Sequence, residues 1–205
     1  MTTQAHLQAH QNHMADEIAE ETGLAHPPEA ADAAPRADRR ANDPSEGQVL
    51  GPGEGTVVPL PGATMVWKAL SGRASGDFVV GEFTAQPGFA GPRPHVHRTH
   101  EELFYVLEGE FDFLVGERTV RLGAGAVVAV PPGVAHDFRN PTARPARWLG
   151  IACPGGLDRY FAEVGALVAD GRFGEAALRE LRLKYDTDEL ERAPAGHWSW
   201  GEERA

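Results

Sequence analysis

The chain has 205 residues, enough for one domain with extensions at its ends. Its formal net charge of −11 at pH 7 repels phosphate backbones and acidic membranes, so we expect neither a nucleic acid nor a membrane as partner. The single cysteine, Cys153, excludes an internal disulfide and suits a reducing compartment, and we expect it to be a small packed residue. No basic segment followed by an apolar one opens the chain, and no apolar run reaches membrane-spanning length. These features predict a soluble, cytoplasmic protein.

Residues 1–55 are predicted to form a flexible tail. They contain no aromatic residue and few β-branched ones, and are rich in Ala, Glu, Asp, Pro and Gly, so they bury too little apolar surface to fold alone. Three histidines fall on one side of a short helix that this segment can form, where a solvated cluster is favoured over a metal site: His6, His10 and His13.

Residues 56–153 carry short runs of β-branched and aromatic residues separated by glycine and proline. About ten such runs predict a closed or sandwiched all-β domain. The run 102–107 leads through Glu108-Gly109, which we interpret as a tight turn, into the run 110–115. Gly116-Glu117 then offers a two-residue hairpin into the run 118–122. The pattern is typical of an antiparallel meander.

His95-Val96-His97 is a chelating pair if it lies on a strand. Residues two apart point to the same face and are roughly 6 to 7 Å apart along the chain, so both imidazoles can approach one ion while Val96 packs on the other face. Glu102 follows His97 after four intervening residues and opens the next strand, so its carboxylate can join them.

A fourth candidate ligand follows the apolar run 126–130. Pro131-Pro132-Gly133 cannot continue a ladder and predicts a turn, after which His136 begins a new strand. Three imidazoles and one carboxylate can thus converge on one divalent transition metal, for which Fe, Mn, Ni, Co and Zn all remain open. The predicted ligands are His95, His97, Glu102 and His136.

Two motifs around these ligands resemble those of the cupin superfamily. The residues that carry the resemblance are His95, His97, Glu102 and Gly109 in the first motif, and Gly125, Pro131, Gly133, His136 and Asn140 in the second. The first motif of the superfamily usually begins with a glycine that five residues separate from the first histidine. Here Gly88 lies one residue before that position and Gly91 two residues after it, so the leading glycine is absent. The resemblance implies a double-stranded β-helix, or jelly roll, with the metal inside one end of the barrel.

Side chains near the ligands suggest a pocket. Phe104 and Phe138 share the inward face of the ligand strands, where they either fill the barrel or line a substrate pocket. Arg93 lies two residues before the first histidine, so on an extended chain its side chain points to the same side and can enter the cavity. A charge that faces solvent is the simpler interpretation. Glu101 is expected on the surface, and His100 at most beside a ligand.

Residues 154–192 change to a helical period. Apolar residues predict one helix from Leu157 to about Gly171 and a second that ends before Asp186. This helical appendage, opened by Pro154-Gly155-Gly156, resembles the ending of small bacterial cupins similar to quercetin dioxygenases. Residues 193–205 are predicted to be a second tail.

The resemblance leaves three hypotheses about function. The first is a dioxygenase that acts on a small oxygen-chelating substrate, such as a flavonol or hydroxyketone, with Glu102 as both ligand and catalytic base. The second is a redox-neutral isomerase, cyclase or lyase that uses the metal as a Lewis acid. The third is a non-catalytic small-molecule-binding cupin. We favour the first, and we expect a homodimer because similar cupins commonly pair edge or terminal strands.

Overall fold

The structure is a computed structural model that describes residues 48–72, 77–191, 194 and 197–198. Most of the predicted N-terminal tail, with its three histidines, and most of the tail 193–205 therefore lie outside the described residues. Residues 48–55 are exposed and carry neither helix nor strand.

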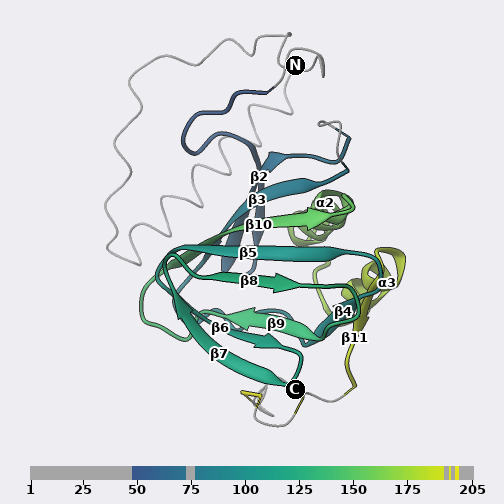
Figure 1. The fold of residues 1–205 in the computed structure, drawn as a ribbon. Coiled ribbons are helices and arrows are strands. Elements are labelled where there is room, and N and C mark those ends of the chain that lie inside the picture. The colour runs from purple at the N-terminus through teal and green to yellow at the C-terminus, as the bar shows by residue number, and fades with distance from the viewer. Residues whose placement is uncertain (1–47, 73–76, 192–193, 195–196, 199–205) are drawn as a thin grey trace, which may run out of the picture. The chain divides into compact units, whose positions relative to one another are not determined.

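The strands form two antiparallel sheets that face each other, as Figure 1 shows. One sheet has the order β1 (Thr56–Leu60), β2 (Ala63–Ala69), β3 (Val79–Ala85), β10 (Ala146–Cys153), β5 (Glu101–Glu108), β8 (Val127–Val130). The other has the order β11 (Thr187–Glu189), β4 (His95–His97), β9 (His136–Arg139), β6 (Glu110–Val115), β7 (Arg118–Gly123). This arrangement confirms the predicted all-β jelly roll.

The core lies between the two sheets. Along β3, buried and half-buried residues alternate, as expected for a strand with one face on a core. Trp148 of β10 stacks on Phe83 of β3 with ring centroids 4.7 Å apart, and Phe104 and Phe138 meet its ring edge-on at 5.1 and 5.2 Å. Aromatic side chains from both sheets therefore fill the barrel.

One predicted turn is different in the structure. Gly116 does join β6 and β7 as a hairpin, but β5 and β6 do not pair with each other. The chain instead passes from one sheet to the other at Gly109, whose φ is +72° and where a Cβ would lie 2.8 Å from that of Ala146. Gly109 is required because a side chain at this crossing has no room.

The C-terminal region contains two predicted helices and one strand that was not predicted. The helices are α2 (Leu157–Ala169), which packs its buried Leu157, Val164 and Leu167 toward the barrel, and α3 (Glu175–Lys184), which has no fully buried residue. After them the chain forms β11, which joins the edge of the five-stranded sheet beside β4. The segment 154–192 is thus more than a helical appendage, since it completes a barrel sheet.

Cys153, expected to be packed, is exposed at the end of β10, where the strand leaves the sheet for α2. Among the described residues, no helix is both long enough and apolar enough to span a membrane.

Candidate metal centre

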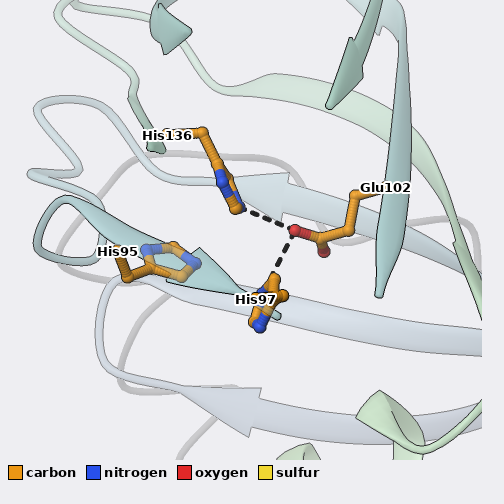
Figure 2. Close-up of side chains that lie close together, drawn as sticks. All are labelled: His95, His97, Glu102 and His136. Carbon is orange, nitrogen blue, oxygen red and sulfur yellow. Dashed lines mark hydrogen bonds and ion pairs between the residues drawn. The ribbon is translucent and has the colours of Figure 1, made fainter. Parts of the chain in front are cut away.

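The four predicted ligands meet inside the barrel. His95 and His97 lie on β4 and His136 is the first residue of β9, which pairs with β4 through His95 and His136. Glu102 comes from β5 in the opposite sheet and reaches across the barrel toward the three imidazoles (Figure 2). One potential ligand atom from each residue lies within 4.8 Å of all the others.

Glu102 holds this cluster together. Its Oε2 lies 2.7 Å from Nε2 of His136 and 3.3 Å from Nε2 of His97, the two contacts dashed in Figure 2. His97 and His136 are 4% and 2% exposed, so the contacts are shielded from bulk water. A single carboxylate oxygen therefore lies where imidazole nitrogens from two strands converge.

The second nitrogen of each imidazole faces a backbone carbonyl. Nδ1 lies 2.8 Å from the Arg93 carbonyl oxygen in His95, 3.0 Å from that of Val134 in His136, and 3.3 Å from that of Asp186 in His97. A carbonyl only accepts hydrogen bonds, so each Nδ1 carries a proton, and each Nε2 is the nitrogen that can offer a lone pair to a metal once it is deprotonated. The donor set and its orientation fit a divalent transition metal.

The protonation of the clustered side chains depends on their burial and on their contacts with one another. Burial opposes ionisation of Glu102, but hydrogen bonds and positive charge from His136 and His97 outweigh it and hold the pKa of Glu102 well below its ordinary value. Burial also opposes the charged form of His136, yet its bond to Glu102 raises the pKa of His136. Burial, with the charges of the other two histidines, lowers the pKa of His95 to about 3. His95 is thus neutral, as a metal ligand must be.

The cluster opens into a cavity of about 600 Å³. Phe104 and Phe138 pack in the aromatic core and also line this cavity, and their contact with a substrate stays a prediction. Arg93 is exposed, as the solvent-facing interpretation expects, and it lies at the cavity wall, where contact with a substrate stays a prediction. Glu101 points outward as expected. The ring of His100 lies 5.5 Å from that of His97, next to a ligand.

The C-terminal elements supply polar residues to the cavity that the sequence analysis missed. Arg182 of α3 is 12% exposed, and its Nη1 lies 2.5 Å from Oε1 of Glu189 on β11 and 3.0 Å from Oε1 of Glu175. All three line the cavity together with Tyr160 of α2. The helical period of this segment predicted both helices. It contained no signal that they line the cavity beside the candidate metal centre.

The comparisons with known proteins agree with this geometry. A family model described as a cupin domain matches residues 81–152, the part of the chain that carries all four clustered residues. Residues 81–152 form a cupin domain.

Quercetin 2,3-dioxygenase from Bacillus subtilis (strain 168) is 27% identical to this cupin over 99 residues. The alignment covers 47% of this chain but only 28% of that protein, so this cupin spans less than a third of its curated relative.

Two solved structures illustrate the structural similarity. KdgF from Halomonas sp. has a TM-score of 0.49 at 19% identity, covering 55% of this chain and 98% of that one. The polyketide cyclase RemF from Streptomyces resistomycificus has a TM-score of 0.45 at 26% identity, covering 51% and 78%.

Proposed function

We propose that this cupin is a metal-dependent dioxygenase that acts on a small, aromatic, oxygen-chelating molecule. The observation that carries the proposal is the position of the cluster, whose three imidazoles and one carboxylate converge beside an aromatic cavity large enough for such a molecule. The similarity to quercetin 2,3-dioxygenase supports it.

His95, His97, Glu102 and His136 would hold one divalent metal, for which iron, manganese, nickel, cobalt and zinc all suit the donor set. When bound, such an ion supplies a Lewis acid with open coordination positions and, if it is redox-active, a route to dioxygen.

The cavity walls would select and orient the substrate. Phe104, Phe138 and Trp148 present aromatic surfaces beside the cluster, which suit a planar ring that stacks or meets them edge-on. These walls exclude water around the reacting atoms. At the polar wall, Arg182 offers N–H donors while Glu189 and Glu175 offer acceptors. Two carboxylates face one guanidinium there, so the wall suits substrate hydroxyl groups, which can donate to a carboxylate and accept from Arg182.

Glu102 would serve as the base. Its carboxylate is held in the charged form and lies at the inner end of the cavity, where it can accept the proton of a substrate hydroxyl.

An oxygen electrode tests this proposal. Protein purified without an affinity tag is first analysed for metals, and a panel of flavonols and hydroxyketones is then offered in air and under nitrogen. We expect oxygen uptake in step with substrate loss, and no turnover under nitrogen. Equal turnover under nitrogen would replace the dioxygenase with a redox-neutral isomerase, cyclase or lyase, and tight binding without turnover would indicate a small-molecule-binding cupin.

A further inference from the structure

The strand that carries His95 and His97 depends on the C-terminal part of the chain. β4 has three residues, and all of them pair with β11: His97 with Thr187, Val96 with Asp188, and His95 with Glu189. On its other side, β4 pairs with β9 at one position among the described residues. The main strand partner of the histidine pair is therefore a segment about ninety residues further along, as the register positions show.

His97 differs from the other two histidines in what orients it. The Nδ1 partners of His95 and His136 are carbonyls two residues earlier in the same loop, so these imidazoles are oriented locally. The Nδ1 partners of His97 are the carbonyl oxygen of Asp186 and the hydroxyl of Thr187, each at 3.3 Å.

The hydroxyl of Thr187 has a defined role in this arrangement. Its side chain is buried, and Oγ1 donates to the carbonyl oxygen of Tyr185 at 3.3 Å. Because its proton is used there, Oγ1 can only accept from Nδ1 of His97. Both neighbours of Nδ1 are thus acceptors, which fixes a proton on Nδ1 and leaves Nε2 as the nitrogen available to a metal.

Asp186 is locked by contacts to the loop that follows His97. It adopts a φ of +57°, which is unusual for a residue with a side chain. Its Oδ2 accepts from the Thr99 backbone N–H at 2.8 Å and from the Thr99 hydroxyl at 2.5 Å, and lies 3.6 Å from Nδ1 of His100. The left-handed backbone aims the Asp186 carbonyl at His97, and the bonds to Thr99 hold it there.

We propose that Asp186 and Thr187 are positioning residues for His97, and that docking of the segment 185–189 is coupled to metal binding. The inference rests on the metal site of the proposed function. The coupling is reciprocal: a docked segment raises metal affinity, and bound metal holds the segment against β4. Because α3 has no fully buried residue, its local stability is expected to be low. A change in how firmly the segment 175–189 docks should therefore be measurable.

The test uses the full chain and Co²⁺ alone, so that no substrate is needed. Thr187→Val keeps the shape of the side chain and removes one of the two acceptors of His97 Nδ1, and we expect a 10- to 100-fold loss of Co²⁺ affinity with altered visible absorption bands. Thr187→Ser restores the hydroxyl and should recover both. Asp188→Asn is the matched control, because the Asp188 side chain pairs with Arg98 instead of a ligand, and it should bind Co²⁺ as the wild type does.

Hydrogen exchange supplies a readout that a merely structural role would not change. Co²⁺ should slow amide exchange in residues 175–190 of the wild type, and slow it less in Thr187→Val. If Thr187→Val does not fold, Asp186→Gly serves instead, since glycine accepts the left-handed backbone while the bonds to Thr99 are lost, and Co²⁺ affinity should again fall.

Wild-type affinity and spectrum in these variants, together with exchange that Co²⁺ does not change, would overturn the positioning role and leave the metal site intact. A wild-type protein that binds no Co²⁺ would overturn the proposed metal site, and the inference with it.

Discussion

Glu102 and His136 belong to different sheets, yet Oε2 of one lies 2.7 Å from Nε2 of the other (Figure 2). This contact joins the two layers of the barrel at the candidate metal centre, whereas the aromatic core joins them over most of their area. The site and the fold therefore rest on different interactions, and they can be separated by mutation.

We predict that His97→Ala and His136→Ala lose most of their bound metal but retain a folded barrel. Each removes one nitrogen donor and leaves the apolar core unchanged. Elemental analysis gives the metal content per chain, and far-ultraviolet circular dichroism reports the strands. Full metal occupancy in both variants would contradict the ligand assignment.

The convergence of the four candidate ligands was predictable from sequence because each depends on local rules. Two histidines two apart on a strand share a face, and a turn at Pro131-Pro132-Gly133 must release the chain before His136. Since the motif fixes these spacings, the convergence of His95, His97, Glu102 and His136 follows from a few elements whose type was evident.

The rest of the site was not predictable, because it depends on contacts between residues far apart in the chain. Glu108-Gly109 has the same turn chemistry whether the chain folds back or crosses to the other sheet, so the crossing was missed. Thr187-Asp188-Glu189 is too short and polar to show a strand pattern, and it is a strand only because β4 offers it an edge. The contact between Arg182 and Glu189 was missed for the same reason, because it depends on the strand that carries Glu189.

Glu102→Gln is predicted to separate binding from turnover. Glutamine keeps the shape and one neutral oxygen ligand but removes the base, so some metal should remain while the rate falls by about 10²- to 10⁴-fold. The matched control is Glu101→Gln, because the adjacent glutamate is exposed on the outer side of β5. Wild-type turnover in Glu102→Gln would show that Glu102 is not the base.

Two glycines before the histidine strand should differ sharply in their tolerance of a side chain. Gly91 has φ +81°, and a Cβ there would lie 1.7 Å from the carbonyl oxygen of Phe138, so Gly91→Ala must displace backbone beside the site. We expect a loss of about 3 kcal/mol in the free energy of unfolding. Gly88, with φ +69° and open space around it, should lose only about 1 kcal/mol as Gly88→Ala. Urea unfolding measures both, and equal losses would contradict the steric argument.

We further predict a homodimer. The outer face of the six-stranded sheet exposes paired apolar residues, Tyr105 on β5 and Val127 on the edge strand β8, at 40% and 53%. A second copy that packs on this face would bury its apolar surface. One that pairs with the edge strand β8 would also remove unpaired backbone N–H and C=O groups from water. Light scattering at micromolar concentration should give about twice the 22.0 kDa mass of the chain. Val127→Asp should shift the particle toward the monomer mass, and a monomeric wild type would refute the prediction.

Asp112 should make the barrel sensitive to acid. This buried carboxylate on β6 accepts from Nε of Arg121 at 2.7 Å and from Nε of Arg139 at 2.9 Å. Burial alone would raise its pKa, but the two guanidinium groups outweigh burial and hold the pKa of Asp112 below its ordinary value of 3.8. The folded state therefore favours the ionised form more than the unfolded state does. The resulting stabilisation is complete above the unfolded pKa and is lost as pH falls through the lower folded pKa.

Asp112→Asn removes the charge and keeps the shape, so it should cost about 1 to 2 kcal/mol in the free energy of unfolding at pH 7. Since the wild type loses the same stabilisation in acid, the difference between the two proteins should shrink as the pH falls below about 4. Urea unfolding curves at several pH values measure this difference directly. Asp170→Asn, at an exposed position after α2, is the control and should change stability little at any pH. A difference between wild type and Asp112→Asn that stays constant from pH 7 into strong acid would show that the Arg121 and Arg139 contacts do not act through the charge of Asp112.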